Sequence, residues 1–151
     1  MSFVYSVKLI CGVQNLPAAP APPCTPVRPG IYATEINIHN FHPAGTPPAQ
    51  IQKQAVLLVH NGTPVGQEPT ALPAQPLPPP LSPITLQPGQ ATMDNCCNLQ
   101  GPLNLNPLVL NIGFLVLVST VALNVTAVYT ATDLRSGTIS IDVVSINERQ
   151  V

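Results

Sequence analysis

Apolar and polar residues alternate along most of the chain that is poor in proline. The clearest case is 123–132, where one face carries Leu123, Val125, Ala127, Tyr129 and Ala131 and the other is largely asparagine and threonine. A period of two is typical of a half-buried strand. The same pattern, with many β-branched residues, predicts further strands at 4–13, 31–41, 51–60, 84–86, 91–95, 113–120 and 138–147. No window keeps a helical period, so helix is expected to be minor.

Turn signals separate these strands. In Gln87-Pro88-Gly89-Gln90, proline presets φ and glycine accepts a positive φ, as a type II turn requires. Asn61-Gly62 predicts a tight turn at the end of a strand, and Arg135-Ser136-Gly137 a turn between the last two strands. Short strands with turns between them predict an all-β fold, a single antiparallel β-sandwich of Greek-key or jelly-roll type.

The 20 prolines of the chain cluster at 17–29, 43–48 and 64–88, which predicts extended, proline-rich connectors. We therefore divide the chain into an N-terminal strand with a proline-rich linker (1–29) and a β-sandwich domain (30–151). Two hypotheses remain open for the first part. Its strand either pairs within its own domain or is lent to the sheet of a neighbouring subunit.

Charge is scarce in this sequence. Charged residues make up 7% of the chain and the formal net charge is -1, against about 25% charged residues in an average soluble protein. A surface with so little charge favours self-association. The few basic residues are Lys8, Lys53, Arg28, Arg135 and Arg149, scattered along the chain, so we expect no nucleic-acid partner.

The apolar stretches are short. The longest, 112–118, contains Gly113 and is far below the ~20 residues that span a bilayer, so we expect no membrane span. Residues 1–11 lack the pattern of a secretory signal. An extracellular or cell-surface or spore-surface location would then require a route that the sequence does not display.

The disulfide candidates are Cys11, Cys24, Cys96 and Cys97. Adjacent cysteines rarely bond to each other, because disulfide geometry needs a wider Cα separation than neighbouring residues have. We therefore expect Cys96 and Cys97 to have different partners, with Cys11 and Cys24 the natural candidates, within one chain or between chains. Four reduced cysteines are the alternative, and adjacent cysteines do not suit a structural zinc site.

Polar chemistry gathers mainly near the strand 31–41. Alternation places Glu35, Asn37 and His39 on one face, and His42 follows. Such a face suits a ligand or divalent metal, whereas a solvated face or a polar interface is the commoner outcome. His60 and Asp94 are the other candidates for acid–base or metal chemistry. No nucleophile motif or phosphate loop is present, so we expect no enzyme activity and no cofactor.

Asn61 and Asn124 match the acceptor pattern for N-linked glycans. At Asn61 the tight turn is the preferred interpretation. Exposed serine, threonine and proline would also accept O-linked sugars, so glycans are a further expected partner.

The strand pattern, the positions of Cys11, Cys24 and Cys96-Cys97, the proline-rich connector and the charge-poor surface together resemble bacterial surface-fibre subunits, in particular disulfide-linked endospore appendage proteins of jelly-roll fold. This chain departs from that family in opening with a strand-like segment. The resemblance implies a structural subunit of an extracellular filament or coat, with copies of itself as the partner. The alternative hypothesis is a β-sandwich module that binds a carbohydrate or a metal.

Overall fold

The structure is a computed structural model that describes residues 1–15, 28–65 and 80–151. The predicted connectors at 17–29 and 64–88 lie largely outside these ranges, as does Cys24, whereas residues 43–48 form a loop. Within the described ranges, no helix is both long enough and apolar enough to cross a membrane.

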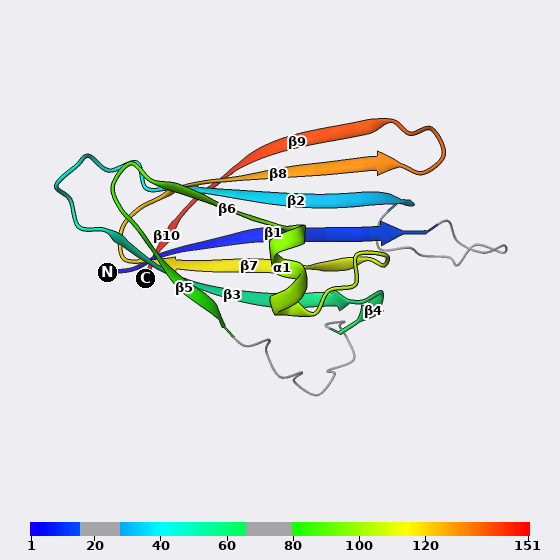
Figure 1. The fold of residues 1–151 in the computed structure, drawn as a ribbon, viewed down its shortest axis with the longest axis horizontal. Coiled ribbons are helices and arrows are strands. Elements are labelled where there is room, and N and C mark those ends of the chain that lie inside the picture. The colour runs from blue at the N-terminus through cyan, green and yellow to red at the C-terminus, as the bar shows by residue number, and fades with distance from the viewer. Residues whose placement is uncertain (16–27, 66–79) are drawn as a thin grey trace.

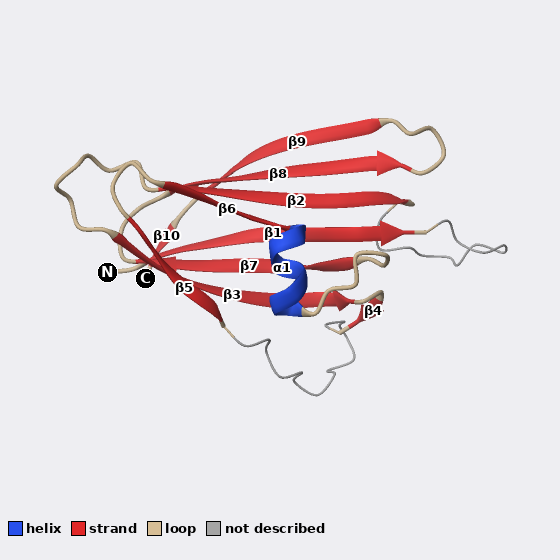
Figure 2. Ribbon diagram, viewed as in Figure 1, coloured by secondary structure: helices blue, strands red, loops and turns tan. Residues whose placement is uncertain are grey.

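Strands dominate the described chain, which confirms the predicted all-β sandwich (Figure 2). In chain order the elements are β1 (Phe3–Gln14), β2 (Gly30–His39), β3 (Ala49–His60), β4 (Thr63–Pro64), β5 (Leu81–Leu86), β6 (Ala91–Asn95), α1 (Cys96–Leu103), β7 (Asn111–Ser119), β8 (Asn124–Asp133), β9 (Ile139–Ile146) and β10 (Arg149–Gln150). All eight predicted strands are present, with ends shifted by up to three residues. The short strands β4 and β10 and the helix α1 were not predicted.

The strands follow the order β4-β3-β7-β1-β2-β8-β9, with β5 on β3, β6 on β2 and β10 on β1 (Figure 1). Neighbouring strands are antiparallel throughout. The strand β1 belongs to both layers, because it pairs with β7 from Phe3 to Cys11 and with β2 from Gly12 to Gln14. The N-terminal strand thus pairs within its own chain.

Gly12 lies where β1 passes from one layer to the other. Its φ is 101°, in the region that favours glycine, and a Cβ at this position would lie 2.0 Å from the carbonyl oxygen of Val109. Strands commonly change sheets at such a local irregularity. The residue type therefore explains how a single strand serves both layers.

The core consists of two clusters. The larger lies between the layers and is built from β1, β2, β3, β5, β7 and β8, including Ile36, Ile51 and Leu115. The smaller lies beneath α1 and includes Leu9, Leu99 and Leu103. The face of the strand 123–132 predicted to be apolar is the inward one, since Leu123, Val125 and Ala127 are buried.

All three predicted turns form. Gln90 N–H donates to the Gln87 carbonyl at 3.0 Å, and Gly89 has a φ of 79°. Asn61 and Gly62 both have positive φ, as a tight hairpin turn requires. Gly137 N–H donates to the Asp133 carbonyl at 2.9 Å in the turn between β8 and β9.

Tyr5 joins β1 to the start of β8. Its buried hydroxyl donates to the Leu123 carbonyl at 3.1 Å and accepts the Leu123 N–H at 2.6 Å. Burial raises the pKa of Tyr5 above its ordinary value of 10.0, and the nearby Glu148 carboxylate raises it further. Stability from the neutral hydroxyl is therefore fully present below about pH 10 and is lost as the pH rises through the folded-state pKa.

The substitution Tyr5→Phe is expected to lower the free energy of unfolding by about 1–3 kcal/mol, because it leaves the buried Leu123 N–H without an acceptor. Urea unfolding at pH 7 measures the loss. The control is Tyr32→Phe at a more exposed position, which should change the midpoint little. Equal, small effects of both substitutions would show that the bond to Leu123 contributes nothing to stability.

Candidate functional site

Exposed apolar residues gather on the outward side of β2, β8 and β9. Opposed residues on neighbouring strands point to the same face, so the strand register arranges this surface in rows. The rows are Ile31, Thr132 and Ile139; Ala33, Thr130 and Ile141; and Glu35, Val128 and Val143. We call Ile139, Ile141 and Val143 the apolar strip.

The apolar strip lies in solvent. Ile139, Ile141 and Val143 are 62%, 65% and 61% exposed, and Ile31 in the first row is 47% exposed. The opposite side of β9 is also open, since Ser140, Asp142 and Val144 are exposed. Asp142 is the one charged residue in the strand. A single exposed leucine needs no explanation, but several β-branched residues together on one strand mark an interaction surface.

The strand β9 is also an end of the strand order, as Figure 1 shows. The opposite end of the order is protected differently. There, the outermost strands are β4, which has two residues and includes Pro64, and β5, which contains Pro83. Short length, proline and lysine are common means of preventing edge pairing. The strand β9 has eight residues and contains no proline and no lysine.

The polar residues predicted from the strand 31–41 lie on the same outward surface. Asn37 Nδ2 donates to the Glu35 carboxylate at 2.9 Å, and His39 lies opposite Asn124 of β8. His42 points elsewhere, with Nε2 at 2.9 Å from the Ala122 carbonyl. In the described part of the chain, no three histidine, cysteine, aspartate or glutamate side chains gather as a metal site would require.

An open groove of about 580 Å³ lies beside this surface, at one end of the sandwich. Its lining includes Phe41, Asn124, Ser145, Asn147 and Glu148. Phe41 is 52% exposed and its ring stacks on that of His42, with centroids 4.5 Å apart. An exposed aromatic ring beside amide and hydroxyl groups is a combination that suits a sugar.

The two predicted glycan acceptors differ. Asn61 is part of a network, because its Nδ2 donates to the Asn104 carbonyl at 3.1 Å and its Oδ1 accepts the Asn106 N–H at 2.7 Å. Asn124 is exposed at the start of β8. Asn61 thus acts in the structure of the turn, in line with the preferred interpretation of that position.

Cys11 and Cys96 form a disulfide between β1 and the first residue of α1, with Cα atoms 5.7 Å apart. This is one of the pairings left open by the sequence. Cys97 is a free, exposed cysteine. A partner was expected for each of the adjacent cysteines, and in the described part of the chain only Cys96 has one.

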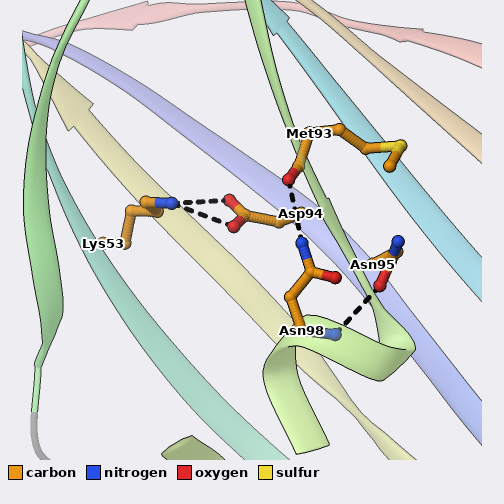
Figure 3. Close-up of polar contacts among 5 residues, drawn as sticks. All are labelled: Lys53, Met93, Asp94, Asn95 and Asn98. Carbon is orange, nitrogen blue, oxygen red and sulfur yellow. Dashed lines mark hydrogen bonds and ion pairs between the residues drawn. The ribbon is translucent and has the colours of Figure 1, made fainter.

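A buried ion pair joins β3 to β6 (Figure 3). Lys53 Nζ of β3 lies 2.9 Å from both carboxylate oxygens of Asp94 of β6, and the side chains are 8% and 10% exposed. Asp94, expected as a candidate for acid–base or metal chemistry, is thus paired with Lys53. The sequence had indicated Lys53 only as one of a few scattered basic residues. The pair is buried and serves the structure.

The residues after Asp94 start the helix. The Asn95 side chain accepts the Asn98 N–H at 2.9 Å as an N-cap, and Asn98 Nδ2 donates to the Met93 carbonyl at 3.2 Å (Figure 3). The ion pair of Asp94, the N-cap of Asn95 and the disulfide of Cys96 thus involve three consecutive residues. They attach α1 to both layers of the fold.

Comparisons with protein-family models, curated proteins and solved structures find no match to this chain.

Proposed function

We propose that this chain is a structural subunit that assembles with copies of itself into a filament or coat outside the cytoplasm. The observation that carries the proposal is the apolar strip on an edge strand that contains neither proline nor lysine and has Asp142 as its one charge. Strands of this kind pair with other strands unless charge, proline or short length prevents it. The low charge of the whole chain supports the same conclusion, because little electrostatic repulsion opposes the approach of a second copy.

The Cys11–Cys96 disulfide supports the proposed location, because disulfides persist mainly in oxidising environments. The strand β1 pairs with β7 of its own chain along nine residues. The proposed assembly therefore uses the surface around β9 as one contact between copies and requires no exchange of β1.

Sedimentation velocity over a range of protein concentrations tests this function. We expect the average mass to rise with concentration, and Ile141→Lys to shift the association to about tenfold higher concentration, because a lysine on an edge strand opposes pairing. The matched control is Leu108→Lys, which changes a residue that is 72% exposed outside the strip. A wild-type protein that stays monomeric at millimolar concentration would overturn the proposal.

A second candidate function is sugar binding in the groove beside Phe41. We expect saturable binding of at least one glycan in a panel, measured by calorimetry, and its loss in Phe41→Ala, because the ring supplies the apolar platform. His39→Ala, on the neighbouring outward face, serves as the control and should retain binding. If no glycan binds, or if Phe41→Ala binds as well as the wild type, this function is removed.

A further inference from the structure

We propose that β9 pairs antiparallel with β9 of a second copy about a two-fold axis at Ile141, so that one sheet continues across both molecules. This inference rests on the proposed function and names the arrangement of the contact. Its evidence is the backbone of β9, the order of its side chains and the position of its one charge.

Among the residues that the structure describes, no strand pairs with the outer edge of β9. Asp133 N–H donates to the Thr138 carbonyl at 2.9 Å, which marks this pair as hydrogen-bonded between β8 and β9. Hydrogen-bonded and non-hydrogen-bonded pairs alternate in an antiparallel ladder. The backbone groups of even-numbered residues of β9 therefore point to β8, and those of Ile139, Ile141 and Val143 point away from it.

These outward groups are self-complementary. With the axis at Ile141, this residue lies opposite Ile141 of the second copy, and Ile139 lies opposite Val143 of the second copy. Each of these is a hydrogen-bonded pair that exchanges two backbone bonds. The apolar strips then meet on the same face of the joined sheet.

Two features favour this register. An axis at Asp142 would also satisfy the backbone, but it would place the two Asp142 carboxylates directly opposite each other, which is destabilising. The axis at Ile141 instead places Asp142 opposite Ser140 of the second copy, and because Ile141 is the middle residue of the apolar strip, it pairs the whole strip of one copy with that of the other. A second copy of the chain therefore matches both the apolar residues and the charge.

A contact of one strand with another is at the small end of protein interfaces. We therefore expect a dissociation constant on the order of micromolar or weaker. A two-fold pair closes on itself, so growth of a filament or coat requires another contact as well. A covalent trap is the appropriate test for such a weak pair.

The test uses cysteine cross-linking in a background of Cys24→Ser and Cys97→Ser. In Ile141→Cys, the two introduced cysteines would face each other with Cα atoms about 5.5 Å apart, a separation at which disulfides form. In the matched variant Ile139→Cys, they would be offset by four residues, about 14 Å along the strand. Mild oxidation with copper phenanthroline, followed by non-reducing electrophoresis, measures the yield of dimer, and circular dichroism verifies that both variants fold.

We expect the dimer yield of Ile141→Cys to exceed that of Ile139→Cys at least fivefold. Equal yields, or no dimer from either folded variant, would overturn the pairing. Particles larger than a dimer without selective cross-linking would remove this pairing and leave the proposed function. Selective cross-linking with no species beyond the dimer would leave the pairing and remove the filament or coat.

Discussion

Replacing Lys53 by methionine is expected to lower the free energy of unfolding by about 3–5 kcal/mol, because it leaves the buried Asp94 carboxylate without its partner. The methionine nearly matches the lysine stem in length, so little packing is lost.

The double variant Lys53→Met with Asp94→Val should recover most of the stability, because replacing both ions by apolar groups removes their desolvation penalty. Urea unfolding of the wild type, the single variant and the double variant measures this difference. Asp142→Asn, an exposed site on β9, is the control and should be nearly neutral. A single variant as stable as the wild type would show that Lys53 and Asp94 are not paired in the folded protein.

Loss of the Cys11–Cys96 disulfide is expected to cost about 4.5 kcal/mol. The two cysteines are separated by 85 positions, and the chain-entropy model gives this magnitude for a loop of that length, since the bond restricts the unfolded chain. Cys11→Ala with Cys96→Ala should therefore unfold at a much lower denaturant concentration. Reduction should lower the midpoint of the wild type and leave that of the double variant unchanged.

Cys97→Ala is the matched control for the disulfide, because it removes the exposed neighbour of Cys96 and no bond. Its midpoint should stay near that of the wild type. If reduction had the same effect on the double variant as on the wild type, the stabilising bond would lie elsewhere in the chain.

Alternation predicted the strands well because a period of two reflects the local geometry of the chain. It could not predict which face each strand buries. Ile139, Ile141 and Val143 have the pattern of an inward face, yet they lie opposite Thr132, Thr130 and Val128 on the outward one. That outcome depends on the register of β9 with β8, which the spacing of residues within 138–147 does not contain.

The burial of Lys53 could have been predicted from the sequence. In the strand 51–60, alternation places Lys53 on the same face as Ile51 and Ala55, both buried. A lysine between two inward apolar residues predicts a buried partner of opposite charge. The identity of the partner still required the structure, since Asp94 lies on another strand.

The helix α1 was missed because Gly101 and Pro102 lower the helix propensity of a segment of only eight residues. Its signals were Asn95, a good N-cap, followed by Leu99 and Leu103 at a spacing of four. Disulfide geometry predicted that Cys96 does not bond to Cys97, and one of the expected pairings, Cys11 with Cys96, is present. The expectation of a partner for Cys97 was wrong, since that cysteine is free.

Electron microscopy of the purified, oxidised protein shows whether the chain assembles by itself. We expect repeating particles, as filaments or sheets, that form without any other component and become rare in Ile141→Lys. A concentrated wild-type sample that contains no ordered particles, with its Cys11–Cys96 bond intact, would contradict it.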